Sequence, residues 1–228
     1  MEDDLRYVEH TPVSRPGPWA QTLRRLPRTA EALVPLVQAV LVHHSRVPDF
    51  AAGSGLRDDG TELRTLRALL DAVATLDPAR WTRTQPLERR LVVDCRSFAL
   101  LLCGVLREHG VPARLRFGFA SYLAADHWQS HVVCEHHDAD GRWTRTDPDT
   151  GRFALSSDAF VDATEAWRSA APDEDLPRYG YAPDLLGRWW PCCLLAAAAP
   201  RWREERALAL RECEDGVVEE AWLGPYVS

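Results

Sequence analysis

One helical segment constrains the fold of this chain more than any other stretch of its 228 residues. Between Asp94 and Gly110, apolar side chains recur three and four residues apart, as in a helix that buries one face: Phe98, Leu101, Leu102, Val105 and Leu106. Asp94 is a favourable N-cap, and Gly110 suits the left-handed residue that ends a helix. The pattern therefore predicts a core helix with Cys95 in its first turn.

The position of Cys95 favours a reactive thiol. Unpaired N–H groups of a first helical turn and the positive end of the helix dipole stabilise an anion, so they favour a thiolate over a thiol. The alternative role is that of a small buried side chain under the helix end. The segments that follow the helix decide between these two interpretations.

After the predicted helix, the spacing of the apolar residues changes to the alternation that is typical of strands. Apolar and polar residues alternate over 114–119, which predicts a strand. A second strand is predicted around 130–136 and a third over 142–146, the latter ending at Asp147 and Pro148. The fold class that follows is α+β, with N-terminal helices and the Cys95 helix packed on an antiparallel sheet.

We interpret residues 1–228 as a single domain without internal repeats. Its predicted parts are a proline-rich extended arm (1–28), a helical lead-in (29–93), a catalytic core (94–151) and a C-terminal extension (152–228). Helical patterns cover 29–44, where His43 and His44 close the helix, and 61–76; the extension has a short helix near 158–167 and edge strands over 207–222.

Composition excludes several classes of function. All 27 basic residues are arginine, which excludes Schiff-base, P-loop and protein-kinase chemistry in their lysine-dependent forms. The net charge of -7 argues against a nucleic-acid partner. An acidic N-terminus and the lack of a long apolar run argue against a membrane partner and favour a cytoplasmic location.

Cysteine usage indicates thiols instead of a disulfide scaffold. The six cysteines are few and irregularly spaced for a chain of this length. The close pair Cys192 and Cys193 is adjacent in sequence, so the two side chains are poorly placed to bind one metal ion together. We therefore expect no metal and no cofactor.

A thiolate nucleophile needs a base, and the base needs a group that orients it. His131 in the second predicted strand and Asp147 at the end of the third have suitable chemistry. If the turn between these strands is centred on Ala139, His131 and Asp147 lie opposite each other in an antiparallel ladder. If Asp140 and Gly141 instead form a two-residue loop, His131 pairs with Thr150 and the triad needs a bulge.

This ordered set of motifs resembles the transglutaminase-like superfamily. The segments that carry the resemblance are Asp94–Ala99, Gly110–Arg114, His131–Glu135, Arg142–Trp143 and Asp147–Pro148. The resemblance covers residues 94–151 and implies a papain-like, transglutaminase-core fold. It also implies that Cys95 is the nucleophile, His131 the general base and acid, and Asp147 the residue that orients the imidazole, in acyl transfer through a thioester.

Four further residues are candidates for contacts with the substrate or an oxyanion: Gln85, His127, Trp128 and Trp143. The amide of Gln85, upstream of the nucleophile, is suited to hold an oxyanion. His127 is a rival base, although the spacings to Glu135 and Asp147 favour His131. The two tryptophans are alternatively core residues.

The expected activity is cysteine-dependent acyl transfer on an amide or thioester of a small molecule, peptide or carrier-bound substrate, by hydrolysis or transamidation. A pathway-specific enzyme that forms amide bonds on a carrier-bound or small amino-acid substrate is one alternative. A non-catalytic binding module with the same fold is a second. A metal site formed by Cys95, His127 and His131 is a third.

Overall fold

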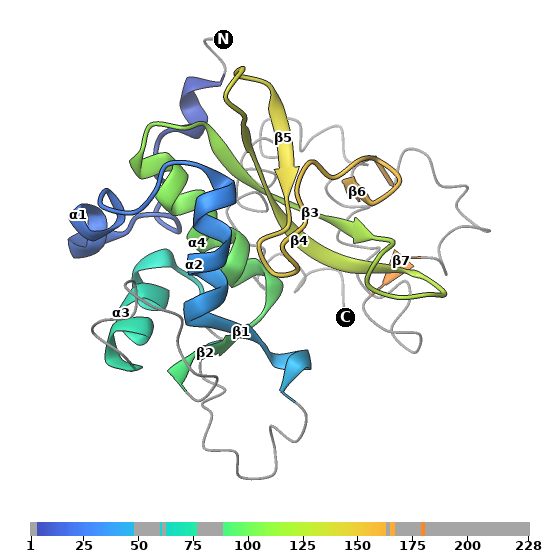
Figure 1. Cartoon of the computed structure of the whole chain (residues 1–228), viewed down its shortest axis with the longest axis horizontal. Helices are drawn as coiled ribbons and strands as arrows, with labels where there is room; N and C mark the ends of the chain where they lie inside the picture. The colour runs from blue at the N-terminus through green and yellow to red at the C-terminus, as the bar shows by residue number, and fades with distance from the viewer. Residues whose placement is uncertain are drawn as a thin grey trace, which may run out of the picture. The chain divides into compact units, whose positions relative to one another are not determined.

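The computed structural model describes residues 4–47, 60, 63–76, 89–162, 165–166 and 179–180 (Figure 1). The chain divides into two compact units, one of residues 1–115 and 133–154 and the other of residues 116–132 and 155–228. Helices and an antiparallel sheet both occur in the described residues, which confirms the predicted α+β class.

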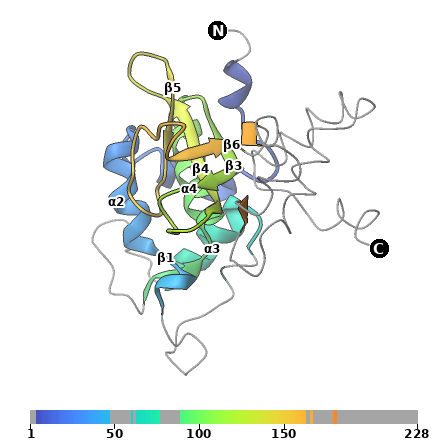
Figure 2. The same ribbon diagram turned by 90° about the vertical axis from the view of Figure 1, so that its right-hand side faces the viewer.

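Helix α4 (Cys95–Glu108) is the centre of the first unit. Every residue from Arg96 to Arg107 is buried, and Gly110 follows the helix with a φ of +75°. Helices α2 (Ala30–Val40) and α3 (Leu66–Leu76) pack against α4, and both views show α2 beside it (Figure 1, Figure 2). The predicted core helix is therefore confirmed, with the same N-cap.

A short parallel pair of strands lies at one end of these helices. Strands β1 (Leu41–His43) and β2 (Leu91–Val93) pair so that His43 is opposite Val93. The helix predicted over 29–44 is therefore wrong after Val40, because the apolar residues that follow pair with a strand 50 residues later in the sequence. Since parallel strands end on the same side, the end of β1 lies beside the start of α4.

The N-terminal segment differs from the extended arm that its prolines predict. It contains short helical segments at η1 (Leu5–Tyr7), η2 (Gly17–Trp19) and α1 (Ala20–Leu23). Tyr7, Val13 and Leu23 are buried. Burial of these apolar side chains favours compact turns over an extended path.

The larger sheet has the strand order β5, β4, β3, β6. Its strands are β3 (Ala113–Ala120), β4 (Trp128–His137), β5 (Trp143–Thr146) and β6 (Phe160–Asp162), and β7 (Tyr179–Gly180) pairs with the start of β4. The three predicted strands are confirmed. The predicted helix near 158–167 is wrong for β6, which pairs antiparallel with the end of β3.

Helix α4 contacts the sheet within the first unit. Cys103 of α4 and Cys134 of β4 are both fully buried. Burial raises the pKa of the Cys134 thiol well above its usual range, and a hydrogen bond with Cys103 raises it further. The two thiols therefore lie in contact, as expected for a helix packed on this sheet.

The predicted edge strands over 207–222 and the residues Cys192 and Cys193 lie outside the described residues. Within the described part of the chain, no helix has both the length and the apolar character that crossing a membrane requires.

Candidate active site

Cys95 is the first residue of α4 and is partly exposed. The preceding Asp94 has extended backbone angles, and its Oδ1 accepts hydrogen bonds from the backbone N–H of Ser97 at 3.1 Å and from the Ser97 hydroxyl at 3.0 Å. This cap fixes the start of the helix at Cys95. The side chain is thus accessible and lies where the helix dipole favours a thiolate.

His43 is the last residue of β1, the strand that pairs with the segment just before Cys95, and His44 is the next residue along the chain. The backbone N–H of Ser45 donates to His43 Nδ1 at 3.1 Å, so the neutral imidazole carries its proton on Nε2. The rings of His43 and His44 stack with centroids 4.4 Å apart. The sequence predicted these residues at a helix end, whereas His43 ends a strand and His44 begins a short 3-10 helix.

His131 lies within β4 and is 3% exposed. The ring of Tyr122 meets the imidazole edge to face, with centroids 6.4 Å apart and an interplanar angle of 84°. Both residues belong to the second unit. Burial against an aromatic ring limits the orientations open to the His131 ring.

His127, the rival base, lies in the loop before β4. Its Nδ1 is 2.8 Å from Oδ1 of Asp126, and this hydrogen bond lowers the pKa of the Asp126 carboxyl. The His127 side chain is 6% exposed, and its Nε2 has no hydrogen-bond partner within the described part of the chain. His127 therefore has its own carboxylate partner, which keeps it a candidate.

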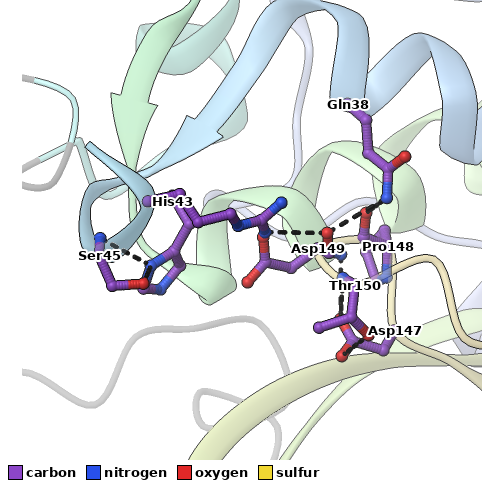
Figure 3. A network of polar contacts seen from close by, with 8 residues as sticks. Gln38, His43, Ser45, Asp147, Pro148, Asp149 and Thr150 are labelled. Carbon is purple, nitrogen blue, oxygen red and sulfur yellow. Dashed lines mark hydrogen bonds and ion pairs between the residues drawn. The ribbon is translucent and has the colours of Figure 1, made fainter. Parts of the chain in front are cut away.

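Asp147 follows β5 and is fully buried. Its Oδ1 accepts from the backbone N–H groups of Asp149 at 2.9 Å and Thr150 at 3.3 Å, and the Thr150 hydroxyl donates to Oδ2 at 2.6 Å (Figure 3). The backbone of the same loop closes through hydrogen bonds between Asp147 and Arg152. The loop thus stabilises the charged form of a buried carboxylate.

Residues 60–148 match the family model of the transglutaminase-like superfamily. Over this segment the chain is similar to that superfamily. The match includes Cys95, His131 and Asp147, so the predicted resemblance is confirmed. No curated protein matches the chain.

One solved structure is similar to this chain. It is a crystal structure from Cytophaga hutchinsonii named "putative cysteine protease", with 16% sequence identity and a TM-score of 0.43. The similarity covers 82% of this chain and 62% of the other, so the chain spans less than two thirds of that protein's length.

The register in which β4 and β5 pair differs from both predicted alternatives. Strands β4 and β5 pair Cys134 with Thr146 and His137 with Trp143, and the ladder ends before His131 is reached. Neither Asp147 nor Thr150 is therefore the ladder partner of His131. The hairpin turn explains the difference.

The turn between β4 and β5 is a three-residue loop closed by Asp138 and Arg142. The Asp138 Oδ1 accepts the backbone N–H groups of Asp140 and Arg142, each at 2.9 Å, and Gly141 has a φ of +74°. A left-handed glycine in the third loop position is typical of such hairpins. The loop is thus centred on Asp140, one residue away from the centre on Ala139.

Of the predicted transglutaminase-like triad, Cys95 and Asp147 belong to the first unit and His131 to the second. Their assembly into a triad stays a prediction. Gln85 lies outside the described residues. No group of three or more histidine, cysteine, aspartate or glutamate side chains that could hold a metal ion is found among the described residues, so a site of Cys95, His127 and His131 gains no support.

The two candidate tryptophans lie in different surroundings. Trp128 starts β4, where its backbone pairs with Tyr179. Trp143 starts β5 and packs against the rings of Tyr7 and His137, and its indole N–H donates to Asp4 at 3.3 Å. The contacts of Trp143 are those of a packing residue, so we leave it out of the proposed site.

Sequence reasoning missed two residues that contact the loop of residues 147–152, which we call the Asp147 loop. Gln38 Nε2 lies 3.1 Å from the carbonyl oxygens of both Pro148 and Asp149 (Figure 3), and Arg46 donates to the Asp149 carbonyl oxygen at 2.9 Å. Both residues are more than 100 positions away from the loop in sequence. No local pattern in the sequence signals such contacts.

Proposed function

We propose that this chain catalyses cysteine-dependent acyl transfer on an amide or thioester. The family match supports a cysteine-dependent enzyme. The observation that carries the finer proposal is the position of Cys95, a partly exposed thiol at the capped N-terminus of α4 inside the matched segment. A nucleophile in this position has a stabilised anion and access to a substrate.

In the proposed reaction, His131 takes the proton of the Cys95 thiol, and the thiolate attacks the carbonyl carbon. The resulting oxyanion is held by backbone N–H groups of the first helical turn. When the tetrahedral intermediate collapses, His131 returns the proton to the leaving amine or thiol, and a thioester to Cys95 remains. Water or an amine then attacks the thioester, again with His131 as base.

Asp147 has the supporting role in this proposal. A buried carboxylate that accepts a ring N–H fixes the tautomer of a catalytic histidine and stabilises the imidazolium. The described contacts of Asp147 are donors to its oxygens, which keep the carboxylate charged and in one orientation. The loop is therefore suited to this role.

The substrate is an amide- or thioester-containing small molecule, peptide or carrier-bound group in this proposal. Hydrolysis and transamidation share the thioester and differ only in the acceptor. An enzyme that forms amide bonds on a carrier-bound or small amino-acid substrate is the second form of the same chemistry. The net charge of -7 argues against a nucleic-acid substrate.

Intact-protein mass spectrometry with a p-nitrophenyl ester as acyl donor tests the proposal. We expect one acyl group on the wild-type protein and none on Cys95→Ala, with Cys103→Ala as the control because Cys103 lies on the same helix but is fully buried. Acylation that persists in Cys95→Ala contradicts the proposal. A protein that no thioester or activated ester acylates indicates a binding module.

The fate of the acyl group separates hydrolysis from transfer. After the donor is removed, the acylated protein is divided between buffer alone and buffer with a primary amine. Loss of the acyl group in buffer alone indicates a hydrolase. Loss only when the amine is present indicates an amide-forming enzyme.

A further inference from the structure

The Asp147 loop is held by residues from outside the segment that matches the family. Gln38 of α2 and Arg46, the last residue of the short helix η3 (His44–Arg46), contact the carbonyl oxygens of the loop. The family match begins at residue 60. Figure 3 shows the amide of Gln38 directed at Pro148 and Asp149.

Arg46 makes two contacts with a single loop residue. Its Nη2 donates to the main-chain oxygen of Asp149 at 2.9 Å, and the guanidinium forms an ion pair with the Asp149 carboxylate. The Asp149 side chain is 6% exposed, so its charge needs a partner. A planar guanidinium can serve a carbonyl and a carboxylate together, whereas an ammonium group is a single point charge.

The residue that Arg46 holds is itself bonded to Asp147. The backbone N–H of Asp149 donates to Asp147 Oδ1 at 2.9 Å. Burial lowers the pKa of Arg46, and the charge of Asp147 opposes that shift, so the guanidinium and the Asp147 carboxylate also attract each other. Arg46 therefore acts on Asp147 through the loop backbone and through its charge.

We propose that Arg46 is a positioning residue of the active site, which fixes the Asp147 carboxylate through its two contacts with Asp149. This inference rests on the proposed function, because it assumes that Asp147 orients the catalytic histidine. Arg46 touches neither the thiol nor the substrate in this account. Gln38 gives the loop a second, uncharged support.

Arg46→Met is compared with Arg24→Met as a matched control. Arg24 also pairs a partly exposed guanidinium with a buried carboxylate, that of Glu108, at 2.8 Å. Glu108 ends the helix that Cys95 begins, about 20 Å away at the rise of an α-helix. Both variants therefore lose one ion pair from the first unit, but only Arg46→Met loosens the Asp147 loop.

The rate of Cys95 acylation by the p-nitrophenyl ester is the first measurement. We expect Arg46→Met to lower the maximal rate constant about 10- to 100-fold, with little change in the half-saturating ester concentration, as for misplacement of a catalytic group. The maximal rate constant of Arg46→Lys should lie between those of Arg46→Met and the wild type. Added guanidinium should restore part of the rate of Arg46→Ala, and Arg24→Met should react like the wild type.

Amide hydrogen exchange over residues 147–152 is the second measurement, and it does not depend on activity. We expect faster exchange at Asp149 and Thr150 in Arg46→Met and unchanged exchange in Arg24→Met. Should Arg46→Met fail to fold, Asp149→Asn replaces it, since that variant keeps the main-chain acceptor and loses only the carboxylate charge.

The proposal is overturned if Arg46→Met and Arg24→Met have equal acylation rates, or if the rate falls while exchange in the loop is unchanged. A wild-type protein that is never acylated at Cys95 overturns the proposed function, and the role of Arg46 in catalysis with it. In that case the exchange data still report whether Arg46 holds the loop, so the two failures are distinguished.

Discussion

Thr150 donates its hydroxyl proton to Asp147 Oδ2 over 2.6 Å, while its own backbone N–H donates to Oδ1 of the same carboxylate. One residue thus contacts both oxygens of a fully buried aspartate. A hydrogen bond to a charged group contributes about 1.5–3 kcal/mol to stability. The hydroxyl of Thr150 therefore fixes the orientation of the carboxylate that the proposed mechanism needs.

Thr150→Val should lower the free energy of unfolding by about 1–3 kcal/mol, because the buried Asp147 loses a donor without a change in side-chain shape. It should also slow acylation of Cys95. Thr150→Ser retains the hydroxyl and is the control, expected to behave nearly as the wild type. Urea unfolding and the ester assay measure both effects, and equal behaviour of the two variants would refute this role.

His136 should make the protein less stable in mild acid. It is 4% exposed, its Nδ1 is 3.0 Å from the carbonyl oxygen of His137, and its Nε2 is 3.0 Å from the Thr146 hydroxyl. Burial lowers the pKa of His136, so below about pH 6.5 the unfolded chain binds a proton that the folded chain does not. Stability from this group is present above that pH and is lost as the pH falls.

Urea unfolding of the wild type and His136→Gln at several pH values tests this expectation. Below about pH 6.5, the free energy of unfolding of the wild type should fall more steeply with decreasing pH than that of His136→Gln. The difference in slope is up to about 1.4 kcal/mol per pH unit. His10, whose pKa is lowered chiefly by burial, contributes in the same direction and remains in both proteins. Parallel curves would show that His136 is not the responsible group.

Gly118→Ala should destabilise the pairing of β3 with β6. A Cβ at this position would lie 2.1 Å from the carbonyl oxygen of Val161 and 2.7 Å from a ring atom of Phe160. We expect a loss of about 1–3 kcal/mol, as for an overpacked site. Gly110→Ala is the comparison, because its Cβ would meet no atom within 4 Å and only its φ of +75° is strained. Thermal unfolding and hydrogen exchange over 160–162 provide the readouts, and intact exchange protection in Gly118→Ala would contradict the expected clash.

Local signals explain why part of the fold could be predicted. The Cys95 helix has its own cap, apolar stripe and terminal glycine, and the strands that follow it alternate clearly. The same segment carries the family motifs, so Cys95, His131 and Asp147 could be selected from the sequence. All of these signals lie within short stretches of the sequence and need no contact with a distant residue.

The features that were missed depend on distant partners. Leu41–His43 follows a helical pattern in sequence but pairs with β2, and Phe160–Asp162 is a strand because Gly118 allows close approach. Tertiary contacts override local propensity in both segments. The register of β4 and β5 depends on side-chain hydrogen bonds of Asp138 within the turn. Neither predicted turn, the one centred on Ala139 or the two-residue loop of Asp140 and Gly141, took these hydrogen bonds into account.

The central claim is that Cys95 is a nucleophile activated by His131, and site-resolved alkylation tests it most directly. Iodoacetamide is added across a range of pH to the wild type, His131→Ala and His127→Ala, and each cysteine is read by peptide mass spectrometry. Cys103 and Cys134, both fully buried, are internal controls. We predict that Cys95 is alkylated faster than Cys103 and Cys134, and that His131→Ala slows this reaction whereas His127→Ala does not. Alkylation of Cys95 no faster than that of the two buried cysteines, or slowing by His127→Ala and not by His131→Ala, would contradict the account.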